Sequence, residues 1–363
     1  MRYLQQKGEK DEKKAEVELD VKDKRILSAL SLNARTPATA LAKGIGLSRD
    51  AVSYRINNLA EKCVILGFRT VLDLKRLGYD SYHVFLRLQM PSREVEEKLI
   101  RKFVGYPFMV AVLKFSGRYD IELALISKDV REFDGIFGTI MDDCSGYVQD
   151  FDVVTISKLL KSNILPKSFF PSKKGIGIDY GGRKLDDKKV GEVGKVREVR
   201  GNIINIDDKD REILNLISND ASMKLHKIAS RVNLSADTIT YRIKRMIREG
   251  IILSFVPFVN YIALGYSVYA LLLRVNNLSG KNELKLRQFM NHDENVIWAV
   301  KTVGRYNVLI YLCVKNTFDL HKSIMALRNY FPGDIKDVET LVAYEEYKYT
   351  YFPECVKSRG EKE

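Results

Sequence analysis

The hydrophobic positions of the chain follow one pattern twice. Helical spacing of apolar residues predicts a helix over 22–32 and, 187 residues later, another over 209–217. Further along each copy an amphipathic run begins directly after Ser48 or Ser235. We expect each serine to cap the first turn of that helix, because its hydroxyl can accept a hydrogen bond from a free backbone N–H.

The residues between these helices predict a tight turn. In the first copy Thr36 is expected to cap a short second helix whose first residue is Pro37. Gly46 and Asn233 follow in the two copies, and both residue types tolerate a left-handed backbone. A small alanine, this turn, Leu-Ser and an amphipathic helix are typical of a helix-turn-helix. The apolar run over 64–71, and its match in the second copy, predict a β-hairpin wing.

A second domain is predicted after each wing. In the first copy strands are expected over 82–88, 109–115, 119–126 and 147–156, with helices over 93–104 and 129–142. The order β-α-β-β-α-β is that of a ferredoxin-like domain. In the second copy the strands are expected near 268–275, 295–303, 306–314 and 335–343.

A shift of 187 positions aligns the two halves over more than a hundred residues, which indicates a duplication. The matching sequence motifs are Tyr-Arg-Ile at 54–56 and 241–243, Leu-Gly-Tyr at 77–79 and 264–266, and Gly-Arg-Tyr at 117–119 and 304–306. The predicted fold is therefore α+β, with two tandem units that each join a winged helix-turn-helix to a ferredoxin-like domain. The expected ranges are a disordered arm 1–19, heads 20–72 and 207–259, ferredoxin-like domains 79–157 and 266–350, a basic flexible linker 158–206 and a tail 351–363.

Composition narrows the class of protein. Hydrophobic residues make up 45% and charged residues 29% of the 363, which is typical of a soluble globular protein. A net charge of +13 favours a polyanionic partner. No apolar run approaches the roughly 20 residues that span a bilayer, so no membrane segment is expected. The four cysteines are scattered, which favours the reducing cytoplasm and argues against a metal site; no cofactor is expected either.

The third helix of each head carries the candidate DNA contacts. The side opposite its apolar stripe, with the flanks of that side, presents polar and basic residues that can contact base edges or phosphates. The candidates are Ser48, Arg49, Ser53, Tyr54, Arg55, Asn57 and Asn58 in the first head, and Ser235, Thr240, Tyr241, Arg242, Lys244, Arg245 and Arg248 in the second. A merely solvated face is the alternative. Arg55 and Arg242 either reach phosphates or pair with carboxylates on the first helix, such as Asp23 and Asp210.

The two faces differ in charge, the second being clearly basic and the first nearly neutral. We therefore expect the second head to supply more of the DNA affinity. Alanine at Lys244, Arg245 and Arg248 should weaken binding more than alanine at Tyr54, Asn57 and Asn58.

Taken together, these sequence motifs make the chain resemble the leucine-responsive/asparagine-synthesis regulator (Lrp/AsnC) family over nearly its whole length outside the arm and linker. The resemblance is carried by Asp20-x-x-Asp23 and Asp207-x-x-Asp210, the Leu-Ser turn, Tyr-Arg-Ile, Leu-Gly-Tyr and Gly-Arg-Tyr-Asp. It implies a sequence-specific DNA-binding transcriptional regulator that is not an enzyme, with an αβ-sandwich effector domain, often called RAM, that pairs through its sheet. Members usually carry one unit and dimerise, so we expect a pseudo-dimer within one chain; higher oligomers are common in the family.

The same resemblance implies a small effector, frequently an amino acid, near the Gly-x-Tyr-Asp turn. The residues carried over are Gly117, Tyr119 and Asp120, and in the second copy Gly304, Tyr306 and Asn307. Asn307 lacks the carboxylate that would pair with an amino group, so the second copy departs from the pattern.

Two other functions stay open. Tandem sirohaem decarboxylases also resemble paired Lrp/AsnC units, and the resemblance implies His-rich pockets for them, whereas His83 and His321 do not match across the copies. The nearly neutral first face keeps open a sensor or assembly module whose heads do not bind DNA. No Ser/His/Asp set and no phosphate-binding glycine loop is recognisable.

Overall fold

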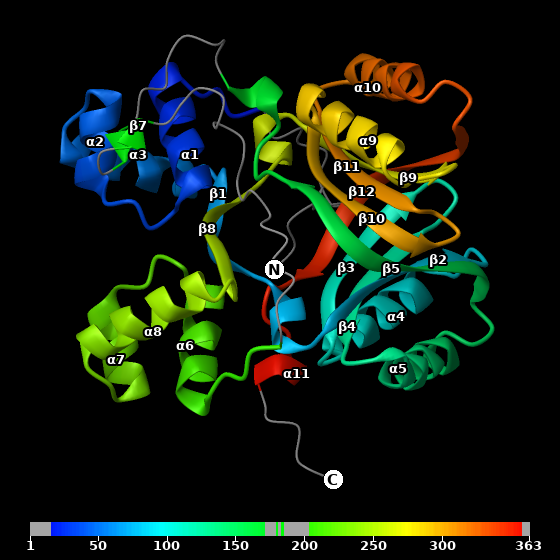
Figure 1. The fold of residues 1–363 in the computed structure, drawn as a ribbon, viewed down its shortest axis with the longest axis horizontal. Coiled ribbons are helices and arrows are strands. Elements are labelled where there is room, and N and C mark those ends of the chain that lie inside the picture. The colour runs from blue at the N-terminus through cyan, green and yellow to red at the C-terminus, as the bar shows by residue number, and fades with distance from the viewer. Residues whose placement is uncertain (1–15, 171–178, 181–182, 185–202, 358–363) are drawn as a thin grey trace.

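The computed structural model describes residues 16–170, 179–180, 183–184 and 203–357. Two helical heads lie on one side of the molecule, and a strand-rich body with helices on its outside lies on the other (Figure 1). The predicted N-terminal arm up to residue 15, most of the predicted linker and the last six residues lie outside the described residues.

The heads have three helices and one strand each. In the first these are α1 (Val21–Leu32), α2 (Ala38–Ile45), α3 (Arg49–Glu61) and β1 (Ile65–Leu72). In the second they are α6 (Asp208–Asn219), α7 (Leu225–Val232), α8 (Ala236–Arg248) and β8 (Ile252–Val259). Short 3-10 helices follow the wing strands, η1 (Leu74–Leu77) and η4 (Ile262–Leu264).

Local chemistry explains where the helices begin. The side chains of Ser48 and Ser235 accept the backbone N–H of the third residue after them, which confirms both predicted caps. The predicted cap of α2 is wrong: Pro37 occupies the N-cap position, no side chain caps the helix, and the Thr36 hydroxyl donates instead to the Asn33 carbonyl. The turn residue after α2 is left-handed, as expected, with φ of 71° at Gly46.

The predicted hairpin wings are wrong in their pairing. Each head supplies a single wing strand, and β1 pairs antiparallel with β8 of the other head, from Ile65↔Val259 to Leu72↔Ile252. Helix α1 packs on β8 and α6 packs on β1, so each head is completed by the strand of the other. The two strands form a two-stranded sheet of their own.

The body contains both ferredoxin-like domains. The first has β2 (Asp80–Leu88), α4 (Arg93–Gly105), β3 (Met109–Ser116), β4 (Ile121–Ser127), α5 (Val130–Asp143) and β5 (Val148–Ser162). The second has β9 (Ser267–Val275), α9 (Lys281–His292), β10 (Val296–Gly304), β11 (Val308–Val314), α10 (Thr317–Tyr330) and β12 (Ile335–Tyr349). The other described elements are η2 (Lys167–Phe169), the two-residue strands β6 (Asp179–Tyr180) and β7 (Arg183–Lys184), and α11 (Glu354–Lys357).

The two four-stranded sheets close into one eight-stranded barrel in the order β10-β11-β9-β12-β3-β4-β2-β5. Strand β12 pairs with β3 on one side and β10 with β5 on the other, so both seams join the two copies. Strand β5 continues to Ser162, beyond the residue at which the linker was expected to begin. The backbone thus holds the two units as one body.

A buried polar cluster crosses the inside of this barrel. Glu122 of β4 is fully buried; its carboxylate is hydrogen-bonded to the imidazole Nδ1 of His83 and accepts the hydroxyl of Tyr311 from the other unit. The positions that match Glu122 and Tyr311 by the 187-residue shift are Leu309 and Ala124. The pairing of unlike residues therefore ties the first unit to the second.

Candidate nucleic-acid interface

The third helices α3 and α8 present similar exposed faces. Tyr54 and Tyr241 occupy equivalent positions and are 72% and 62% exposed. Asn57, Lys244 and Arg248 are also exposed. No hydrogen bond or ion pair within the described part of the chain engages the side chains of these five residues. A tyrosine that stands open to water on a helix, without packing, is available to contact a partner.

Four smaller candidates flank this face. The Ser48 and Ser235 side chains cap their helices, while the Ser53 and Thr240 hydroxyls donate to the carbonyls four residues before them. The Ser48 hydroxyl only accepts, so its proton remains available to a phosphate oxygen, whereas the Ser53 and Thr240 hydroxyls have already donated their only proton. Arg49 is exposed beside Asp50 at 3.4 Å, and Asn58 is half-buried.

The arginines at the border of the apolar stripe belong to the fold of the heads. Arg55 Nη1 lies 2.7 Å from carboxylate oxygens of both Asp20 and Asp23. Arg242 Nη1 lies 2.7 Å from Asp207 and 2.9 Å from Asp210. Of the two readings left open by the sequence, the carboxylate pairing is confirmed for both arginines.

The electrostatics of these pairs follow from their geometry. Hydrogen bonds to Asp207 and Asp210 raise the pKa of Arg242, and those to Asp23 and Asp20 raise the pKa of Arg55. Both guanidinium groups are therefore held in charged form by the first helix. Their role is to fix α3 and α8 against α1 and α6.

Arg245 is the candidate that the structure removes from the exposed face. Its Nη2 is bonded to Asp210, and its Nε lies 3.7 Å from Glu249. The fully buried Asp210 therefore receives two arginines, whereas Asp23 in the first head receives one. The charge of Arg245 is thus used within the head, and its contact with DNA stays a prediction.

Helix α7 adds cations that the sequence analysis did not single out. Lys224, Lys227 and Arg231 are exposed on or beside it, and the matching residues of the first head are Pro37, Ala40 and Gly44. The spacing of these three cations along one predicted helix was readable from the sequence.

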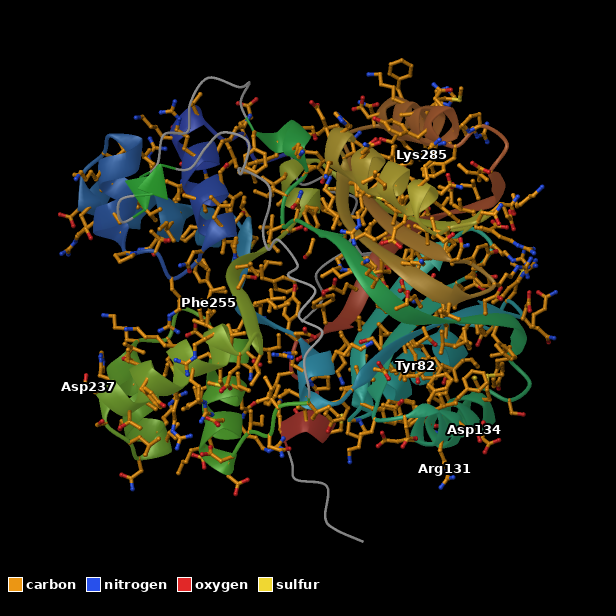
Figure 2. All side chains as sticks on the ribbon, viewed as in Figure 1. Tyr82, Arg131, Asp134, Asp237, Phe255 and Lys285 are labelled. Atoms are coloured by element: carbon orange, nitrogen blue, oxygen red, sulfur yellow. The ribbon has the colours of Figure 1, made fainter. Side chains whose placement is uncertain are left out.

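The two heads are linked by reciprocal hydrogen bonds. The Ala34 N–H donates to the Phe255 carbonyl at 2.8 Å, and the Ala221 N–H donates to the Phe68 carbonyl at 3.0 Å. These bonds are related by the 187-residue shift. Figure 2 shows Phe255 between the two heads and Asp237 at the outer edge of the second head. The third helices α3 and α8 are therefore carried on one pseudo-symmetric support.

The predicted effector turns lie where the two units approach each other. A Cβ on Gly117 would stand 2.8 Å from Leu341 Cδ2 of β12, and one on Gly304 would stand 2.5 Å from the Val153 carbonyl oxygen of β5. Both glycines have positive φ, of 143° and 149°. Only glycine fits such an approach without displacement of the neighbouring strand.

The tyrosines of these turns are buried. The Tyr119 hydroxyl donates to Asp152, and burial together with this carboxylate and Tyr306 raises its pKa. Arg118 pairs with Glu339 and Arg305 with Asp152, two bonds between the units that the 187-residue shift interchanges. The turns therefore form a charged seam between the copies.

Asp120 and Asn307 differ in their free bonding capacity. One carboxylate oxygen of Asp120 accepts the Leu88 N–H at 2.7 Å, and the other has no partner among the described residues. The Asn307 amide instead bonds both the N–H and the carbonyl of Val275, at 2.9 and 2.6 Å. Only the first copy keeps an uncommitted oxygen at this position.

The comparisons with known proteins agree with this geometry. Residues 19–60 match the model of the AsnC-type helix-turn-helix domain, and residues 206–252 match a winged helix-turn-helix DNA-binding model. The regulator LrpA of Pyrococcus horikoshii is 30% identical over 143 residues, which are 39% of this chain and 99% of that protein. The proline dehydrogenase transcriptional activator of Rhodobacter capsulatus is 33% identical over 121 residues, which are 33% of this chain and 79% of that protein. The chain belongs to the Lrp/AsnC family.

The two-unit form of this Lrp/AsnC protein has a counterpart among solved structures. The siroheme decarboxylase NirDL matches with a TM-score of 0.60 at 12% identity, over 93% of this chain and 96% of that chain. At this identity the match concerns the fold, and it covers both units of the Lrp/AsnC chain together. Within the described residues no helix is both long and apolar enough to cross a bilayer, and no three His, Cys, Asp or Glu side chains gather to hold a metal ion.

Proposed function

We propose that the protein is a transcriptional regulator that binds duplex DNA through both third helices, α3 and α8. The observation that supports this most is the pair of exposed tyrosines at equivalent positions, Tyr54 and Tyr241, on helices whose other faces are packed. The exposed cations beside Tyr241 neutralise phosphates, and the amide of Asn57 can hydrogen-bond base edges. The regulators named among the relatives support the same function.

The test is a fluorescence-anisotropy titration with the full chain. A duplex from upstream of its own gene is compared with a scrambled duplex at two salt concentrations. We expect preference for the upstream duplex and an affinity that falls with salt, because each neutralised phosphate releases counterions. Binding to neither duplex at low salt would reject the proposal.

Two matched variants show which head contributes more to the DNA affinity. Lys244→Ala/Arg248→Ala removes two exposed cations, so the salt slope should fall by about 2 and the affinity near 0.1 M salt by tens of fold. Tyr54→Ala/Asn57→Ala should cost less affinity and leave the slope unchanged. Arg245 is left in place, because its loss would disturb the bond to Asp210.

An amino-acid effector is part of the proposal, and we place it at the first copy. The free oxygen of Asp120 can accept a hydrogen bond from an ammonium group, whereas the oxygen and the nitrogen of the uncharged Asn307 amide both already bond Val275. Calorimetry with the set of amino acids should detect binding to the wild type that Asp120→Asn abolishes. An unchanged affinity in this variant would place the effector elsewhere.

A sirohaem decarboxylase is the second candidate, favoured by the match of fold with NirDL over both units. Incubation with sirohaem and recording of the absorbance spectrum test it directly. A time-dependent spectral shift with product formation would establish the enzyme, and an unchanged spectrum would exclude it.

A further inference from the structure

The support of the two heads is symmetric. The β1–β8 ladder and the two bonds Ala34–Phe255 and Ala221–Phe68 relate the heads by a pseudo-two-fold. The first head also reaches into the second with a side chain: the Thr70 hydroxyl donates to the Ile217 carbonyl at 2.7 Å. The positions of α3 and α8 relative to each other are therefore set by the backbone, as in a symmetric dimer.

The surfaces on this support are not symmetric. By the 187-residue shift, Tyr54 matches Tyr241 and Asp50 matches Asp237, so part of each face is shared. The rest of the face differs in chemistry. The unlike pairs are Arg49 and Ala236, Asn57 and Lys244, and Glu61 and Arg248, with every residue except Ala236 capable of a polar contact.

These differences determine what each head can recognise. The Asn57 amide both donates and accepts, which suits the N6 and N7 edge of adenine, and Arg49 suits guanine or a phosphate. Glu61 repels phosphates where Arg248 attracts them. Apart from the arginines that pair with the first helix of their own head, α3 carries one arginine and two carboxylates, whereas α8 carries Lys244, Arg248 and one carboxylate. The first head is thus equipped to read bases with little phosphate attraction, and the second to hold the backbone.

We infer that the DNA target is composite: two unlike half-sites on one duplex, bound in a single orientation. The inference rests on the proposed function and goes further, because a homodimer of one-unit chains presents two equal faces and binds an inverted repeat in either direction. Here the covalent pairing of unlike heads gives the complex a direction along the DNA.

Selection from a random-sequence duplex library with the full chain tests the two halves. Wild type should enrich a motif whose halves differ. Arg49→Ala/Asn57→Lys/Glu61→Arg copies the second face onto the first and should enrich an inverted repeat of the α8 half. Ser53→Thr, which copies the hydroxyl already present at Thr240, is the matched control and should enrich the wild-type motif.

A native cysteine reports the orientation. Cys63 is exposed directly after α3, while its counterpart in the second head is Gly250. An iron chelate attached to Cys63 cuts nearby DNA when ascorbate and peroxide are added. We expect cuts beside the α3 half only. Cys63→Gly should give none, and glycine suits this position because φ is 56°. Both proteins carry Cys355→Ser, since that thiol is half-buried and the other two are buried.

The outcomes separate the two proposals. An inverted repeat selected by the wild type, a motif with a single half, or equal cuts beside both halves overturns the composite site and leaves DNA binding intact. Absence of any enriched or retained duplex overturns the proposed function itself.

Discussion

Asp210 is the residue on which the second head depends most. It is fully buried at the start of α6, its carboxylate binds Arg242 and Arg245, and it accepts the Asp207 N–H at 3.4 Å. Asp210→Asn keeps the shape and removes the charge. Two guanidinium groups, about a quarter or less exposed, then lose a buried counter-charge, and Arg242 keeps only Asp207 while Arg245 keeps only Glu249 at 3.7 Å. Removal of one partner from a buried ion pair costs about 3–5 kcal/mol of stability. Because the arginines are partly exposed, we expect a loss at the lower end, about 3 kcal/mol.

The first head provides the matched control. Asp23 has an 11% exposed side chain and binds one arginine, Arg55, so Asp23→Asn should cost about 1–2 kcal/mol. Hydrogen exchange followed by mass spectrometry measures both heads in one experiment. A loss of about 3 kcal/mol should speed exchange in α8 roughly a hundredfold. In the Asp23 variant, α3 should change by about tenfold.

The fluorescence of Trp298 in β10 serves as an internal standard, because it reports on the barrel. The midpoint of barrel unfolding, followed by this fluorescence, should be unchanged in both variants. Unaltered exchange in α8 of the Asp210 variant, or equal effects in the two heads, would refute the view that the second arginine makes this network stronger.

Three further predictions concern the body. Gly304→Ala should lower the melting temperature by several degrees, because the new Cβ meets a β5 carbonyl oxygen at 2.5 Å, while Gly135→Ala in the open part of α5 should raise it slightly. Burial raises the pKa of Glu346 to about 8, so folding favours its protonated form. The melting temperature of Glu346→Gln should therefore equal that of wild type near pH 4 and exceed it by several degrees as the pH rises through 8. A hydrogen bond from Lys158 helps to lower the pKa of Glu283 to about 2, so Glu283→Gln should cost about 1–2 kcal/mol at pH 7, a deficit that disappears as the pH falls from 4.5 towards 2. Thermal melts followed by Trp298 fluorescence check all three, and a pH-independent difference would contradict the last two.

The sequence determined what depends on neighbours in the chain. Helix spacing, the caps at Ser48 and Ser235 and the left-handed turn at Gly46 are local, so they were readable and the structure confirms them. The cap of α2 was placed one residue early, because proline suits both the N-cap and the first helical position. The duplication was also a property of the sequence, since an alignment of the chain with itself needs no coordinates.

Only the tertiary structure decided which parts meet. A wing strand has the same pattern whether it pairs with a neighbour in its own head or with the opposite copy, and β1 paired with β8. Helical periodicity placed Arg245 on the open face, but a long side chain can turn toward a buried carboxylate, and Asp210 attracts it. The hydrogen bond from Tyr311 to Glu122 joins residues that are 189 positions apart, and no local sequence pattern links them. Periodicity fixes which side of an element is apolar; the choice between partners that present equally suitable surfaces comes from the packing of the whole chain.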